Sequence, residues 1–281
     1  MDFSLTEEQT AVRETFRSFS EKEVKPVAAE LDREPRYPME LFLMAGKLGL
    51  FGMRYPQPEG AEMGMLSFIL ALEELAAASL SVAASCTMQS LMGTYFVHRF
   101  TRDELREQLF LPALEGKVIG TICMTEPDAG SDLLGLTTRA EMQGGRWFIT
   151  GQKTWITSAQ EADMFTVLAR TGEKELSFFL VEKGVAGLEV GKSIDKSGVR
   201  ASPTSEVSFS EAPATCMLGE QGSGLASLRE ILAEIRVVTA ALALGVARAA
   251  LEDSILYSQQ RVQFGKPICK FQAVQSHLAE M

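Results

Sequence analysis

The sequence predicts an α+β protein: an N-terminal all-α domain over 1–116, a middle antiparallel β-barrel or sandwich domain over 117–215, and a partial C-terminal α-helical bundle over 216–281. Three observations predict it. Apolar residues first recur at helical spacing, short runs rich in β-branched and aromatic residues follow, and helical spacing then returns. Helices and strands that are grouped, and do not alternate, favour an α+β architecture.

The N-terminal helices are predicted from their apolar spacing and from one cap. Thr6 and Gln9 have the form of a capping box, and Val12, Phe16 and Phe19 follow at helical spacing. The first helix is therefore expected from residue 7 to about residue 31. Further helices are expected at 39–48, 66–78, 81–100 and from there towards Gly116, with a loop rich in Pro and Gly at 49–64.

The middle part carries six predicted strands, at 118–124, 136–142, 146–150, 164–169, 176–181 and 206–209. Gln143-Gly144-Gly145 has the composition of a hairpin turn between two of them. Since no helical pattern separates the strands, an antiparallel barrel or sandwich is favoured.

The segment 219–224 predicts a flexible junction, after which a long helix is expected to about Gln260 and a second helix from near Phe271. The chain stops inside this amphipathic pattern. Two helices do not close a bundle, so we expect either that the chain is C-terminally incomplete or that it pairs with another chain.

Composition limits the classes of function. A net charge of -10 argues against a nucleic-acid binder, and two histidines exclude a His-rich metal site. Four cysteines without a C-x-x-C pair are expected to be free thiols. The N-terminus has neither a signal nor a transit pattern, and the apolar region 65–97 is broken by Glu73 and Glu74. A cytoplasmic protein without a membrane span is expected.

Two segments of the middle part have the form of a ligand site. The apolar run 118–124 leads into the turn Thr125-Glu126-Pro127-Asp128-Ala129-Gly130-Ser131-Asp132, which presents backbone N–H groups and short hydroxyls at a strand end. Lys153-Thr154-Trp155-Ile156-Thr157-Ser158-Ala159 follows, and strand alternation places Trp155 and Thr157 on one face. Such a surface suits a planar or anionic ligand.

A third motif is Arg261-Val262-Gln263-Phe264-Gly265-Lys266-Pro267, with Phe271-Gln272 beyond it. In this order the three motifs resemble the acyl-CoA dehydrogenase flavoprotein family, and the resemblance runs from Met1 to Met281. It implies FAD as cofactor and an acyl-CoA thioester as substrate. It also implies α,β-dehydrogenation to the 2-enoyl-CoA, with electrons passed to an electron-transfer flavoprotein.

The resemblance assigns flavin contacts to residues of the first two motifs. In the family the tryptophan packs on the flavin rings, the threonine two residues later reaches the redox-active edge, and the serine of the turn also contacts the acyl-CoA. The residues assigned here are Ile122, Met124, Thr125, Gly130, Ser131, Trp155, Ile156 and Thr157.

The third motif matches the family segment that reaches across a subunit interface to a neighbour's FAD, where an arginine fork suits the pyrophosphate. Its assigned cofactor contacts are Arg261, Gln263, Phe264, Phe271 and Gln272. The resemblance therefore implies a homo-oligomer, typically a tetramer. Arg236 matches the arginine that holds the CoA portion. The chain departs from the usual pattern beside it, because Ala233 stands where many relatives place an acidic residue.

The catalytic residue is not identified in this sequence. Most relatives place a catalytic glutamate beyond the position of Met281, and a minority use the residue before the arginine, which here is Ile235. Glu234 lies one position away, about 100° around a helix, and is rejected as a substitute. The base is expected beyond residue 281.

The substrate region gives one clue about the acyl group. No Lys or Arg occurs in 75–97, where relatives that take dicarboxylic acyl chains carry an arginine. An uncharged acyl group is therefore expected. The helix expected to line the pocket carries Val82, Ala83, Ala84, Cys86 and Met88, with some polarity from Ser85, Thr87 and Gln89.

Two other interpretations remain open at this point. The chain could be a non-catalytic FAD- or acyl-CoA-binding subunit of a mixed oligomer, which a continuation without an active-site carboxylate would favour. It could also be an oxidase or reductase on the same fold, which differs in oxygen access and flavin potential.

Overall fold

The computed structural model describes residues 3–281, apart from the side chain of residue 103. Its N-terminal part is helical, as predicted. Thr6 and Gln9 form the predicted capping box, and the chain continues as helix to Arg33 through one π-helical turn. The elements are α1 (Glu7–Phe19), a π turn (Ser20–Val24), α2 (Lys25–Arg33), α3 (Met39–Lys47), α4 (Gly64–Ala78), α5 (Leu80–Thr87), a π turn (Met88–Gly93), α6 (Thr94–Phe100), α7 (Asp103–Leu105), a π turn (Arg106–Phe110) and α8 (Leu111–Leu114).

The middle part is an eight-stranded sheet of order β6-β7-β3-β2-β4-β5-β8, with β1 paired to β4. The strands are β1 (Gly120–Cys123), β2 (Arg139–Gln143), β3 (Arg146–Thr157), β4 (Met164–Arg170), β5 (Leu176–Glu182), β6 (Leu188–Ser193), β7 (Thr204–Pro213) and β8 (Cys216–Leu218). Pairing is antiparallel as predicted, except that β1 and β2 each pair with β4 in parallel. The reason is the loop after β1, which carries the chain back to the start of β2 and closes no hairpin.

Two strands have no clear signal in the sequence. β6 is an edge strand whose side chains are almost all exposed, so it lacks the apolar alternation of a half-buried strand. β8 is only three residues long. β3 is longer than the predicted strand over 146–150, because it passes through Gly151 and reaches Thr157. The second motif therefore lies at the end of β3.

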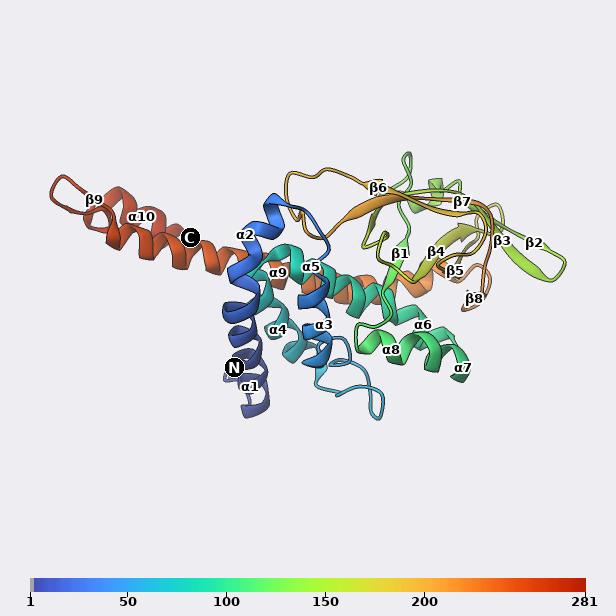
Figure 1. The fold of residues 1–281 in the computed structure, drawn as a ribbon, viewed down its shortest axis with the longest axis horizontal. Coiled ribbons are helices and arrows are strands. Elements are labelled where there is room, and N and C mark those ends of the chain that lie inside the picture. The colour runs from blue at the N-terminus through green and yellow to red at the C-terminus, as the bar shows by residue number, and fades with distance from the viewer. Residues whose placement is uncertain (1–2) are drawn as a thin grey trace.

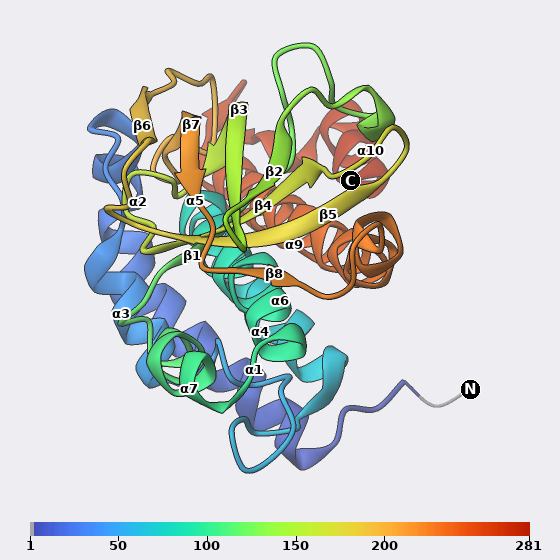
Figure 2. The ribbon, with the colours of Figure 1, turned by 90° about the vertical axis from the view of Figure 1, so that its right-hand side faces the viewer.

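The helical part and the sheet meet at a close contact between Gly93 and Gly120. A Cβ atom added to Gly120 would lie 2.4 Å from the Gly93 carbonyl oxygen, so the π turn crosses β1 backbone against backbone. Gln89 fixes the crossing, because its amide accepts from the Gly120 N–H at 2.9 Å and donates to the Val118 carbonyl at 2.8 Å. Figure 2 shows the sheet lying over the helices at this junction.

The last part is dominated by α9 (Gly224–Gln260), which is followed by the short strand pair β9 (Val262–Gln263) and β10 (Lys266–Pro267) and by α10 (Gln272–Glu280). Figure 1 shows α9 running from the sheet past the N-terminal helices, with β9 and α10 at the far end. Arg248 fastens it to α4 by pairing with Glu73 at 3.0 Å and Glu74 at 2.8 Å. No helix in the described residues is long and apolar enough to cross a membrane.

Candidate functional site

The fold joins the first two motifs directly. The loop after β1 lies on the end of β3, where the Thr154 N–H donates to the Thr125 carbonyl at 2.9 Å. The Lys153 ammonium donates to the Met124 carbonyl, also at 2.9 Å. At the strand end, the Thr121 hydroxyl donates to the Thr157 carbonyl at 2.6 Å. Two segments that are separate in the sequence therefore form one surface.

Beneath this surface lies a buried ion pair. Lys153 Nζ is 3.0 Å from Glu126 Oε1, and the two side chains are 0% and 3% exposed. The Glu126 carboxylate also accepts from the Thr137 N–H and hydroxyl, both at 2.7 Å, and from the Thr138 N–H at 2.9 Å. Burial opposes ionisation of Glu126, but these hydrogen bonds and the Lys153 charge outweigh it and lower its pKa to about 2.

A bulge in β3 turns Trp155 outward. The register between β3 and β7 shifts between Lys153 and Ile156, and Trp155 has a φ of +60°. Lys153 and Thr154 are consequently both buried, whereas the Trp155 side chain is exposed. Beyond the bulge, Ile156 is buried and Thr157 is half-buried. The backbone of Trp155 is strained, and its large apolar side chain is exposed to solvent. Packing within the protein does not account for this arrangement.

The loop offers donors next to this indole. Met124 and Thr125 are half-buried, and among the described residues no acceptor lies at hydrogen-bond distance from their N–H groups. Gly130 and Ser131 are exposed, and a Cβ at Gly130 would lie 4.0 Å from the Thr125 methyl group. Ile122, by contrast, is buried in β1. Free N–H donors beside an exposed aromatic ring fit the polar edge and flat face of a flavin.

An apolar cavity of about 220 Å³ opens beside Thr157. It lies between α5, its π turn, α9 and the loop before β7. Of the helix residues expected to line it, Ala84 and Met88 do so, while Val82, Ala83 and Cys86 are buried in the core. The lining residues are Ala84, Thr87, Met88, Leu91, Met92, Thr157, Lys196, Val199, Ser202, Ile235 and Leu242.

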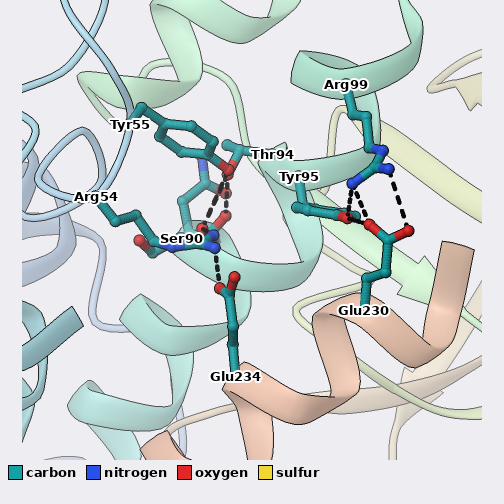
Figure 3. Close-up of polar contacts among 9 residues, drawn as sticks. Arg54, Tyr55, Ser90, Thr94, Tyr95, Arg99, Glu230 and Glu234 are labelled. Atoms are coloured by element: carbon teal, nitrogen blue, oxygen red, sulfur yellow. Dashed lines mark hydrogen bonds and ion pairs between the residues drawn. The ribbon is translucent and has the colours of Figure 1, made fainter. Parts of the chain in front are cut away.

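On α9, neighbouring residues have different partners. Ile235 lines the cavity, whereas Glu234 pairs with Arg54, so its carboxylate is engaged elsewhere. One turn earlier, Glu230 pairs with Arg99 and accepts from the Tyr95 hydroxyl at 3.1 Å. Figure 3 shows both contacts joining α9 to the N-terminal helices. Arg236 is exposed and takes part in neither of these contacts.

The third motif is not brought to this site within one chain. It follows α9, whose 37 residues span roughly 55 Å at 1.5 Å per residue, and it lies at the end of the molecule remote from the sheet (Figure 1). Its residues are largely open: Arg261, Gln263 and Gln272 are exposed, Phe264 is 93% exposed, and Phe271 is half-buried.

Comparison with known protein families identifies the family of this chain. Residues 6–117 match the N-terminal domain of acyl-CoA dehydrogenases, 121–212 the middle domain, and 222–281 the C-terminal domain. The chain belongs to the acyl-CoA dehydrogenase family. This confirms the predicted family, fold class and enzyme class.

Individual acyl-CoA dehydrogenases agree with this assignment. The chain is 51% identical to benzylmalonyl-CoA dehydrogenase of Aromatoleum aromaticum, over 100% of the chain and 76% of that protein. It is 35% identical to the butyryl-CoA dehydrogenase structure of Megasphaera elsdenii, with a TM-score of 0.94, covering 100% of this chain and 76% of the other. A glutaryl-CoA dehydrogenase of Mycobacterium smegmatis in complex with FADH2 is 31% identical with a TM-score of 0.93, covering 98% of this chain and 72% of the other.

Sequence reasoning missed several residues of this candidate site. Lys196, Val199 and Ser202 reach the cavity from a loop more than a hundred positions after α5. Glu126 and Lys153 stand inside the predicted motifs but were given no role. Regular alternation would place Lys153 on the same face as Trp155 and Thr157, so no local signal points to the pair, because only the bulge in β3 turns Lys153 inward.

Acid stability should depend on Glu126. Its lowered pKa means that its stabilisation is complete above the ordinary value of 4.5 and is lost as the pH falls through about 2. We expect the free energy of unfolding to fall by roughly 2 kcal/mol more in the wild type than in Glu126→Gln between pH 5 and pH 2.5. Urea unfolding at a series of pH values measures this. Parallel curves for the two proteins would contradict it.

Proposed function

We propose that the protein is an FAD-dependent dehydrogenase that converts an acyl-CoA thioester to its 2-enoyl-CoA and passes the electrons to an electron-transfer flavoprotein. One observation carries the proposal: Thr157 lies both at the end of the strand that bears Trp155 and in the wall of the apolar cavity. A flat ligand on Trp155 would therefore border the space available to an acyl chain.

The residues present suit FAD. Trp155 offers an aromatic face, and the Met124 and Thr125 N–H groups offer donors that the fold leaves free among the described residues. Bound FAD supplies the hydride acceptor. We assign the buried residues Ile122 and Ile156 to the part of the site beneath the bound FAD. The exposed residues Gly130 and Ser131 are assigned to its solvent-facing side. The likeness to a structure in complex with FADH2 supports this assignment.

The acyl group is assigned to the cavity between α5, its π turn and α9. The wall is mostly apolar, which favours an uncharged acyl group, as the sequence predicts. Lys196 is the one cation among its lining residues. Its ammonium donates to the Ser202 carbonyl at 2.6 Å and to the Thr204 hydroxyl at 2.8 Å, so neutral oxygens already engage it. A thioester bearing a second carboxyl group, such as benzylmalonyl-CoA, is the alternative that the first relative named above supports.

The CoA portion is assigned to exposed Arg236 and to Ser131. The third motif is assigned to the FAD of a second copy, because α9 holds it far from the sheet, whose strand β3 bears Trp155 (Figure 1). This assignment predicts a homo-oligomer, a tetramer by resemblance. Ile235 lines the cavity and has no ionisable group. By resemblance to the family, in which most members use a glutamate of the C-terminal region, the proton acceptor is expected beyond the position of residue 281.

A spectral titration tests the proposed function. The full-length gene product, purified under argon, should show an oxidised-flavin absorption band, and one acyl-CoA of a panel should bleach it. Butyryl-CoA and benzylmalonyl-CoA separate the uncharged from the carboxylated class. Bound flavin that no thioester bleaches would favour the non-catalytic binding subunit, and a protein that binds no flavin would refute the proposal.

A further inference from the structure

The buried pair of Lys153 and Glu126 has a geometric consequence for the loop above it. Lys153 reaches the carbonyl oxygen of Met124 at 2.9 Å from within the protein. In a trans peptide the C=O and the following N–H point in opposite directions. Holding the Met124 carbonyl inward therefore turns the Thr125 N–H outward, and this is one of the two donors without an acceptor among the described residues.

Glu126 determines where the lysine stands. Its carboxylate is held by the Thr137 N–H and hydroxyl and by the Thr138 N–H, which belong to the segment just before β2. The pair thus connects three segments: the loop after β1, the start of β2 and the bulge of β3. Thr154, next to Lys153, fixes the following peptide through the Thr125 carbonyl at 2.9 Å.

Stability alone is a weak reason for such a pair. Removing two charges from water is costly, and replacing a buried ion pair by apolar side chains of similar size is often neutral or stabilising. Burial lowers the pKa of Lys153 although the negative charge of Glu126 beside it acts in the opposite direction. The cost of removing the ammonium group from water therefore exceeds its attraction to the carboxylate. A role in holding one loop conformation accounts for the pair better.

We propose that Lys153 and Glu126 are positioning residues of the flavin site, which fix the Met124–Thr125 peptide so that the Thr125 N–H is aimed at the ligand beside Trp155. The inference rests on the proposed function, because it takes the ligand to be FAD. Neither side chain touches the ligand, since both are buried beneath the loop. A fixed donor stabilises negative charge on the reduced flavin ring system more than a mobile one does.

The test separates positioning from stability with a charge-free double variant. Lys153→Met with Glu126→Gln removes both charges and nearly keeps the volumes, so its apoprotein should still fold, with a melting temperature lowered by the lost hydrogen bonds. We expect its dissociation constant for FAD to be at least tenfold higher, its flavin absorption band to shift, and its flavin reduction potential to become more negative. Apoprotein titration with FAD, visible spectroscopy and dye-coupled reduction of the full-length chain give these readouts.

A matched control is Glu74→Gln, which also alters a buried carboxylate paired with cations, Arg17 and Arg248, but lies away from the loop. It should leave FAD binding and potential unchanged. A double variant with wild-type affinity, spectrum and potential would overturn the inference while the proposed function stands. If wild type binds no FAD, the proposed function itself fails.

The single variant Lys153→Met decides the matter if the double variant does not fold. Glu126 then keeps its three hydrogen bonds from Thr137 and Thr138, but the Met124 carbonyl loses its donor. We expect at least a threefold rise in the FAD dissociation constant, and a value within experimental error of wild type would overturn the inference.

Discussion

Replacing Trp155 with alanine should weaken FAD binding by tenfold to a hundredfold without destabilising the apoprotein. The indole is 57% exposed, so little packing is lost on truncation. Stacking of an aromatic side chain on a planar ring system contributes about 1–3 kcal/mol, and the expected range of affinity lies within this interval because about 1.4 kcal/mol is a factor of ten. The FAD dissociation constant from apoprotein titration and the apoprotein melting temperature measure the two effects separately.

Trp147, on the same strand, provides the control. Its ring centroid lies 5.3 Å from that of Phe179, and it packs against the buried residues of the sheet, among them Ile149 and Phe209. Trp147→Ala should lower the apoprotein melting temperature and leave the FAD dissociation constant unchanged. If Trp155→Ala binds FAD as tightly as wild type, the assignment of the flavin face to this indole is wrong.

Replacing Gly120 with alanine should destabilise the whole protein by about 3 kcal/mol, a large share of the 5–15 kcal/mol typical of a folded domain. The added methyl carbon would lie 2.4 Å from the Gly93 carbonyl oxygen and 2.7 Å from its carbon, and backbone atoms have no rotamer by which to move aside. β1 and the π turn would have to separate, which also disturbs the three hydrogen bonds of Gln89. The urea midpoint and the soluble yield measure this.

Gly198→Ala is the matched control for Gly120→Ala, because Gly198 has open space around it. A Cβ there meets no atom within 4 Å, so Gly198→Ala should change stability by less than about 0.5 kcal/mol. The contrast between the two glycines isolates the backbone contact from the general effect of removing a glycine. A Gly120→Ala protein as stable as Gly198→Ala would show that the junction can open without cost.

Much of the fold follows from local patterns. The capping box at Thr6 and the apolar spacing after it predict α1, and short runs rich in β-branched and aromatic residues predict β4 and β5, because each signal arises within one element. β6 escapes prediction because an exposed edge strand needs no apolar face. The parallel pairing of β1 with β4 likewise depends on where a loop returns the chain, which no local pattern records.

For the site, too, some features follow from the sequence and others only from the tertiary structure. The order of the three motifs was enough to predict the family, whereas the shared ligand face of Trp155 and Thr157 stays a prediction. Only the tertiary structure shows that Lys153 and Glu126 are paired beneath the loop, that Lys196 reaches the cavity, and that Glu234 is engaged by Arg54. The physical reason is that burial and pairing of a charged side chain depend on which distant segments the fold packs around it.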